Sequence, residues 1–310
     1  MDKNIIKLLS ILLIIIATIC FISFSGNETY NNDGKTKISS INDNESENNI
    51  NIVTSFYPIY IMTINVTYGV KGVNVSNMSE NLKGCIHDYT LSTEDLKKVE
   101  KASVFIETGE NLEPFSNKIK TIYPNVKIID TRKNVSNLIQ EDGEVNPHIW
   151  MNTSNYCEQV NEIAKQLGES DVINKNKYME NAENYNKKVN EITNKFSTLN
   201  LNGVKAVSLD EQLEYLLKQN GMDVISIETD HENSALSADV VSKTIKRMND
   251  TNIKAIFIDK DSDDKNAKML ANETGAKIYR LNSAMNGDNS YDSYIKDMNE
   301  NYEILKQVKE

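Results

Sequence analysis

The chain has 310 residues, of which 39% are hydrophobic, and a formal net charge of −11 at pH 7. This length is more than one ordinary hydrophobic core supports, so it predicts two domains of about 100–150 residues each. The acidic balance argues against nucleic-acid binding, because no stripe of Lys and Arg is present to neutralise phosphates.

Residues 1–25 form an export signal and stand outside the fold. Lys3 and Lys7 give a positive start, and Ile5 to Phe24 is almost wholly apolar, as in secretory signals. An apolar run of about 20 residues can also span a bilayer if it is not cleaved. Cys20 leaves a lipid anchor open beside a retained helix and a released protein. We expect an extracytoplasmic protein, on the cell surface or periplasmic side, anchored through its N-terminus.

Residues 26–50 are polar, with few apolar side chains to bury. This composition predicts a disordered tether between the membrane and the folded part. Once Cys20 is set aside, only Cys85 and Cys157 remain, which is too few for a disulfide framework.

From residue 51 onward, short β-rich runs alternate with helical patterns. In the first half we expect strands at 52–56, 73–75, 104–106 and 126–129, with a helix over 93–101. In the second half we expect strands at 204–208, 224–227, 255–258 and 277–279, with helices over 211–219 and 240–248. Such alternation predicts mainly parallel sheets covered by helices, and its repetition predicts two similar α/β lobes.

The segment 155–199 contains no Pro and only one Gly, Gly168. We expect a pair of helices interrupted at that glycine, the second from about residue 174 to residue 196 and roughly 35 Å long. A rigid strut between the lobes is one interpretation, and a solvated surface helix is the other. The predicted division is therefore an N-terminal lobe at 51–172, a linking helix at 173–200 and a C-terminal lobe at 201–310.

Two of the three histidines stand in unusual local sequences. His87 lies in Gly-Cys-Ile-His-Asp-Tyr and His148 in Asn-Pro-His-Ile-Trp. Imidazole is the commonest protein ligand of transition metals, so the pair suggests a metal site assembled from distant parts of the chain. The alternative is that each is an ordinary surface or core histidine.

Residues 51–310 resemble the zinc/manganese substrate-binding proteins of ABC transporters. The resemblance rests on the export signal, the opening Ile-Val-Thr-Ser-Phe-Tyr-Pro, the two histidine motifs and the long central helix. It implies two lobes joined by one long rigid helix, with a metal ion, Zn²⁺ or else Mn²⁺, bound by His87 and His148 in the cleft between them. It also implies delivery of the metal to a membrane permease, no catalysis and a monomer.

The family's third ligand opens the first helix of the second lobe, five residues before an aromatic position. Here Asp210 stands five residues before Tyr215, so the resemblance implies Asp210 as the third metal ligand. The alternative is that Asp210 only caps the helix that begins at Glu211.

The fourth family ligand is a carboxylate, and the matching position falls near Met285. Met285 is more often a packing residue, and Asp288, Cys85 or water could take the place instead. The alternative for Cys85 is that it is a buried thiol with no chemical role. His231 matches no family ligand, and we interpret it as a structural or surface residue.

Two other functions stay open. A diverged family member could have weak or no metal binding and act as a surface interaction protein or bind another ligand. A zinc hydrolase would use the same ligand types with one open position. However, the sequence contains no His-Glu-x-x-His and no Gly-x-Ser-x-Gly, which are common marks of hydrolases.

Overall fold

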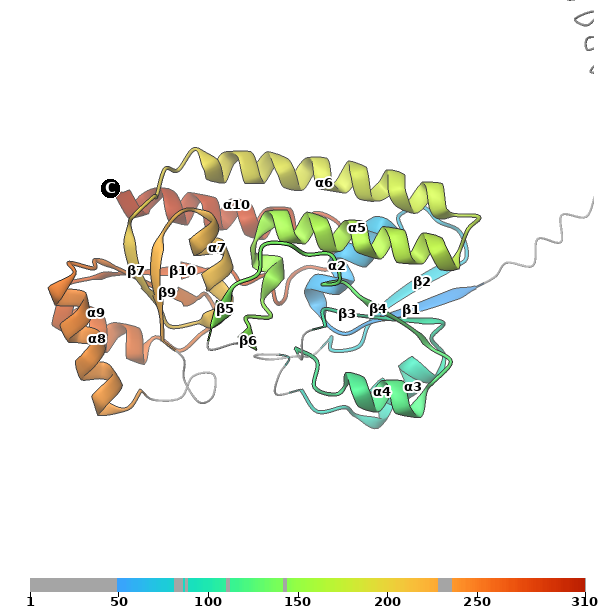
Figure 1. Cartoon of the computed structure of the whole chain (residues 1–310), viewed down its shortest axis with the longest axis horizontal. Coiled ribbons are helices and arrows are strands. Elements are labelled where there is room, and N and C mark those ends of the chain that lie inside the picture. The colour runs from blue at the N-terminus through green and yellow to red at the C-terminus, as the bar shows by residue number, and fades with distance from the viewer. Residues whose placement is uncertain are drawn as a thin grey trace, which may run out of the picture. The chain divides into compact units, whose positions relative to one another are not determined.

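The computed structural model describes residues 49–80, 86, 89–109, 112–141, 144–227 and 236–309. They belong to one compact unit, Glu47–Glu310. Two sheets lie toward opposite ends of this unit, and three long helices run along one side of it (Figure 1). The export signal and most of the tether lie outside the described residues. Within those residues, no helix has the length and apolar character that crossing a membrane requires.

The first lobe contains a four-stranded parallel sheet in the order β2-β1-β3-β4. Its strands are β1 Ile50–Thr54, β2 Val73–Asn77, β3 Val104–Glu107 and β4 Lys127–Asp130. Its helices are α2 Tyr57–Val66, α3 Thr93–Glu100 and α4 Ser116–Ile122. Pro58 stands in the first turn of α2, where its missing N–H costs no hydrogen bond. All four strands are at or within two residues of their predicted positions.

The second lobe repeats this arrangement, with a parallel sheet in the order β10-β9-β7-β8. Its strands are β7 Lys205–Ser208, β8 Asp223–Ser226, β9 Ala255–Asp259 and β10 Lys277–Leu281. Its helical segments are η3 Glu211–Leu213, α7 Glu214–Gln219, α8 Ala238–Asp250, α9 Lys265–Thr274, α10 Ser293–Lys306 and η4 Gln307–Lys309. In each sheet the first strand of the lobe lies between the second and the third, which confirms the prediction of two similar α/β lobes.

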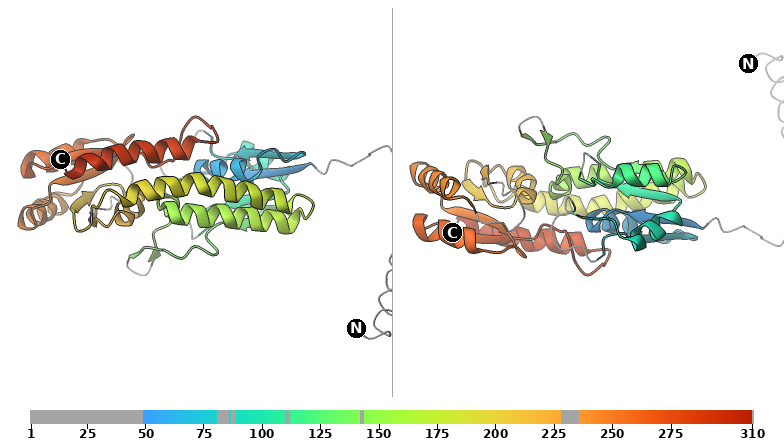
Figure 2. Two further views of the ribbon diagram at one scale, coloured as in Figure 1. Left: turned by 90° about the horizontal axis from the view of Figure 1, so that it is seen from above. Right: turned by 90° about the horizontal axis from the view of Figure 1, so that it is seen from below.

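In the sequence between β4 and β7, the chain forms a small hairpin, a helical turn and two long antiparallel helices. These are β5 Gln140–Glu141, β6 Glu144–Val145, η2 Ile149–Met151, α5 Thr153–Ser170 and α6 Lys175–Ser197. Helix α6 runs alongside both α5 and α10 (Figure 2). Its buried side chains recur at helical spacing from Tyr178 to Phe196, so α6 packs one face against the protein rather than being solvated all round.

The break between the two helices is not at Gly168, as the sequence predicts, but at residues 171–174. Gly168 lies inside α5, where an added Cβ would come within 2.8 Å of the Cγ of Lys175. The glycine therefore allows the start of α6 to pack closely on α5, and it does not end the helix.

One continuous hydrophobic core extends through both lobes. Trp150 is fully buried at their junction, where its Nε1 donates to the carbonyl of Ser283 at 2.9 Å and the Tyr294 hydroxyl donates to the carbonyl of Trp150 at 2.8 Å. The ring of Tyr294 stacks on that of Tyr156, with centroids 3.6 Å apart. A smaller core lies between the second sheet and helices α8 and α9.

A buried carboxylate closes the end of the first sheet. Glu113 accepts hydrogen bonds from Ser55 Oγ and from the backbone N–H of Thr108, both at 2.8 Å, and from the backbone N–H of Gly109 at 3.1 Å. It thereby joins the ends of β1 and β3. Burial raises the pKa of Glu113 from 4.5 to about 7, although these donors act in the opposite direction.

This pKa predicts how stability depends on pH. The folded protein holds the Glu113 proton to higher pH than the unfolded chain, so the free energy of unfolding should fall as pH rises from about 4.5 to about 7, by up to about 3 kcal/mol from this group. Urea unfolding of Glu113→Gln should show a smaller fall over this range. Asp297, whose pKa burial also raises to about 7, supplies part of the remainder. The exposed control Glu180→Gln should keep the wild-type slope, and an unchanged slope in Glu113→Gln would contradict the prediction.

Candidate metal site at the lobe junction

His148 lies where the chain leaves the hairpin and enters the helical turn η2. It directly follows Pro147 and occupies the position before Ile149, the first residue of the turn. The side chain is buried, and its ring meets the edge of the Trp150 ring with centroids 5.3 Å apart. The imidazole is therefore fixed against the residue that fills the junction between the lobes.

Asn146 determines which nitrogen of His148 carries the proton. Its Nδ2 donates to Glu214 Oε2 at 3.0 Å, so its Oδ1 is the atom that faces His148. That oxygen accepts from the His148 backbone N–H at 3.0 Å and lies 3.0 Å from Nδ1 of the ring. An amide oxygen can only accept, so Nδ1 must carry the hydrogen. In the neutral imidazole Nε2 is then the nitrogen without a hydrogen, as a metal-binding nitrogen must be.

The second lobe holds this loop in place. Glu214 is fully buried, and its carboxylate forms an ion pair with Lys218 one turn further along α7. The Tyr215 hydroxyl donates to the carbonyl of Asn146 at 2.8 Å and accepts from the backbone N–H of Ile139 at 3.0 Å. Helix α7 therefore supplies the hydrogen bonds that orient a histidine of the first lobe.

Glu211, which the sequence analysis did not select, is the carboxylate in contact with His148. Its Oε1 lies 3.8 Å from His148 Nδ1, and its side chain is 35% exposed. It is the first residue of η3, next to the predicted Asp210. The adjacent acidic pair Asp210-Glu211 was the signal available in the sequence, and the family position five residues before Tyr215 falls on Asp210.

Asp210 makes its contacts within the second lobe. Oδ2 accepts from the backbone N–H of Asp259 at 2.6 Å, and Oδ1 accepts from Ser262 Oγ at 2.9 Å. Burial raises its pKa. Asp210 occupies the capping position of η3, but its side chain makes no capping hydrogen bond. Its carboxylate instead ties the start of η3 to the end of β9.

The remaining candidate ligands divide into two groups. His87, Cys85 and His231 lie outside the described residues. Met285 is partly buried and packs against the main core. Asp288 is exposed and forms an ion pair with Lys296 at 2.6 Å, which holds the pKa of this carboxyl well below its usual range. Within the residues that the structure describes, no three His, Cys, Asp or Glu side chains are gathered as for a metal ion.

The described part of the site thus offers one oriented imidazole and one partly exposed carboxylate across the junction of the two lobes. Nitrogen and oxygen donors of this kind suit divalent ions such as zinc and manganese.

Comparison with known proteins agrees with this picture. A family model described as zinc-uptake complex component A, periplasmic, matches residues 52–308. The zinc-binding protein AdcA of Streptococcus pyogenes serotype M3 is 26% identical over 265 residues, which cover 75% of this chain and 50% of AdcA. This chain therefore spans about half the length of that relative. A metal ABC transporter substrate-binding lipoprotein of Lactococcus lactis is 25% identical over 241 residues, covering 71% of this chain and 76% of the lipoprotein.

Solved structures share the fold. FpvC of Pseudomonas aeruginosa in complex with Ni²⁺ superposes with a TM-score of 0.74 at 22% identity, covering 84% of this chain and 96% of FpvC. This likeness confirms the two-lobed α/β architecture. With the family model matched over most of its length, the chain belongs to the family of zinc-uptake component A, the metal substrate-binding proteins of ABC transporters that its motifs resemble.

Proposed function

We propose that this protein captures a divalent transition metal outside the cytoplasm, zinc first and manganese next, and delivers it to an ABC importer in the membrane. The observation that carries the proposal is the orientation of His148, whose Nδ1 faces Asn146 Oδ1 at 3.0 Å and whose Nε2 is therefore the nitrogen without a hydrogen. Histidines that bind metals typically donate their other ring N–H to an oxygen in this way.

The proposed ligands are His87, His148 and a carboxylate from the pair Asp210-Glu211. We favour Glu211 as the carboxylate. Its side chain is 35% exposed, whereas both oxygens of Asp210 accept hydrogen bonds within the second lobe. Binding a metal through Asp210 would use the lone pairs that those two bonds leave on its oxygens. The 3.8 Å contact of Glu211 Oε1 is with Nδ1 of His148, so it brings the carboxylate to the ring but not to Nε2. Water, or one of the residues considered for the fourth position, completes a tetrahedral set.

The export signal and the tether support a working place outside the cytoplasm, with the N-terminus as the membrane anchor. We propose that the protein acts as a monomer and catalyses no reaction. The names of the relatives support the permease as its partner, since one of them is a metal ABC transporter substrate-binding lipoprotein.

Removing a proposed ligand tests the site directly. His148→Ala and His87→Ala should each weaken zinc binding, measured by calorimetry on the purified full chain in detergent, by more than about 100-fold, because the loss of a ligand should exceed the 10–100-fold loss usual for an outer partner. His231→Ala, which matches no family ligand position, is the matched control and should bind as the wild type does. If the wild type shows no heat with zinc or manganese, metal capture is wrong and the diverged, non-metal alternative stands.

Asn146→Ala tests whether the hydrogen bonds that run from Glu214 through Asn146 orient the imidazole of His148. We expect zinc affinity to fall about 10–100-fold, because the imidazole loses the acceptor that selects its tautomer. Nitrogen NMR of the metal-free protein should find the His148 proton on Nδ1 in the wild type and a mixture of tautomers in Asn146→Ala. The exposed substitution Asn202→Ala is the control. A wild-type His148 protonated at Nε2 would contradict the assignment.

The two adjacent carboxylates can be separated by isosteric substitutions. Glu211→Gln should weaken zinc binding strongly with little change in stability. Asp210→Asn should instead lower the free energy of unfolding by about 1–3 kcal/mol, because a partly buried, hydrogen-bonded acceptor is altered, while changing zinc affinity less than Glu211→Gln does. Calorimetry and urea unfolding measure the two effects. The reverse pattern would make Asp210 the ligand, as the family position implies.

A further inference from the structure

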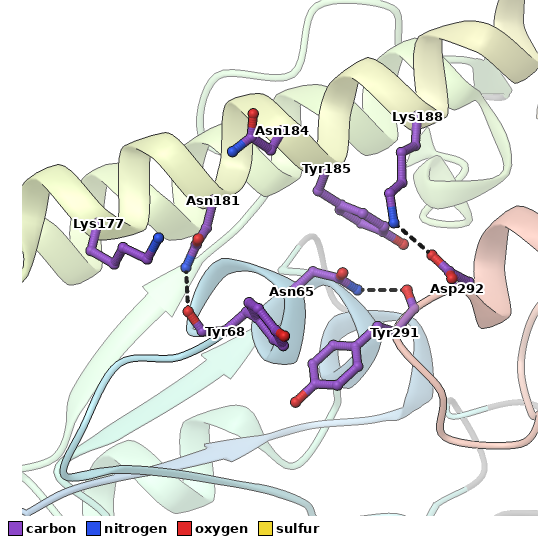
Figure 3. Close-up of a pocket in the computed structure, with 9 residues that line it drawn as sticks. All are labelled: Asn65, Tyr68, Lys177, Asn181, Asn184, Tyr185, Lys188, Tyr291 and Asp292. Atoms are coloured by element: carbon purple, nitrogen blue, oxygen red, sulfur yellow. Dashed lines mark hydrogen bonds and ion pairs between the residues drawn. The ribbon is translucent and has the colours of Figure 1, made fainter.

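A cavity lies away from His148, between α2, α6 and the segment that leads into α10 (Figure 3). Its volume is about 440 Å³, within the range of small-molecule sites. It is lined by Asn65, Tyr68, Lys177, Asn181, Asn184, Tyr185, Lys188, Tyr291 and Asp292. None of these residues takes part in the proposed metal site.

Two buried asparagines line this cavity with their acceptors unused. Asn65, 8% exposed, donates through Nδ2 to the carbonyls of Ile61 and Tyr291, both at 2.9 Å. Asn181, 7% exposed, donates through Nδ2 to the carbonyls of Val66 at 2.9 Å and Tyr68 at 2.8 Å. Neither Oδ1 accepts a hydrogen bond from the described part of the chain. Neither oxygen is among the buried side-chain atoms that lack a partner, so both are accessible to solvent. Each can therefore accept a hydrogen bond from a ligand that brings hydroxyl or amine hydrogens.

The mouth of the cavity carries two aromatic rings. Tyr68 is 57% exposed and Tyr291 is 47% exposed, and no other aromatic side chain in the described ranges is comparably exposed. Their rings meet edge to face, with centroids 5.1 Å apart. Exposed rings beside polar groups offer a flat apolar surface with a hydrogen-bonding tip. They suit a ligand that has an apolar face as well as polar edges.

The charges around the cavity are paired, so it does not select a charged ligand. Lys188 forms an ion pair with Asp292 at 2.9 Å, drawn in Figure 3, and Lys177 pairs with Glu180 at 3.3 Å. Asn184, also on α6, lines the same cavity and makes no hydrogen bond within the described residues. The amide of Asn184 adds an uncharged hydrogen-bond donor and acceptor to the lining of the cavity.

From these features we propose that the cavity binds a saccharide unit, a neutral ligand that carries several hydroxyl groups. The hydroxyls would donate to Asn65 Oδ1 and Asn181 Oδ1. The amide of Asn184 would form hydrogen bonds with other hydroxyls of the sugar. The C–H face of the sugar ring would pack on the face of one tyrosine ring and against the other, since Tyr68 and Tyr291 stand at 84° to each other. A hydroxyl both donates and accepts, which matches a lining of amides and phenols better than a phosphate or an ammonium group does.

The test uses the purified full chain in detergent and saturation-transfer NMR. The probes are N-acetylglucosamine, glucose and galactose as free sugars and a β-1,4-linked N-acetylglucosamine tetramer as a polymeric glycan, with spermidine and inorganic phosphate as charged comparisons. We expect transfer to at least one sugar and to neither charged probe. Preference for the tetramer would indicate a polymer as the source, and equal binding would indicate free sugars.

Variants then place the sugar in this cavity. Tyr68→Ala and Tyr291→Ala should each weaken binding about three- to tenfold, because each removes one aromatic packing surface. Both side chains are half exposed, so the fold should persist, which circular dichroism checks. Met179→Ala, an exposed change elsewhere on α6, is the control. Absence of binding by every sugar, wild-type affinity in the Tyr68→Ala, Tyr291→Ala double variant, or binding of spermidine in place of sugars would each overturn the proposal.

Discussion

The junction of the two lobes is filled by one side chain, and the rest of the molecule is arranged around it. Trp150 is fully buried, and both its Nε1 and its carbonyl are hydrogen-bonded to the segment of the second lobe that includes Ser283 and Tyr294. A buried Trp contributes several kcal/mol to stability. Because this burial is shared, the lobes are parts of one core and not two bodies joined by a flexible linker.

The same constraint positions His148. The histidine is two residues before Trp150 and its ring packs against that side chain, so the burial of the tryptophan places the imidazole. Asn146, from the first lobe, and Glu214, from the second, then select its tautomer through hydrogen bonds. Packing determines where the ring lies and hydrogen bonding determines which nitrogen is available.

Much of the fold could be predicted from the sequence because parallel strands buried on both faces leave continuous apolar runs. Segments such as 104–106 and 255–258 are of this kind, and both lie within strands. The helix break was misplaced because Gly168 has a packing role that only its spatial neighbour Lys175 reveals. The sequence alone does not distinguish a glycine inside a helix from a glycine that follows its end.

The candidate site was harder to predict than the fold, for a physical reason. His148 stands in a motif with local meaning, whereas Asp210 and Glu211 are neighbours whose side chains take different directions from the start of η3. One is hydrogen-bonded to the end of β9 and the other contacts the imidazole. No periodicity distinguishes them. The same holds for Asn65 and Asn181, since nothing in their local sequence shows that their amide hydrogens are used and their oxygens are not.

Helix α10 has a consequence for the order in which the molecule forms. The last long helix packs against α6 and α2, and the hydroxyls of Tyr57 and Ser293 meet at 2.7 Å across 236 residues of sequence. Contacts of such separation form late, because closing a long loop costs entropy that local structure does not repay. The core of the first lobe is therefore completed only when the end of the chain is available.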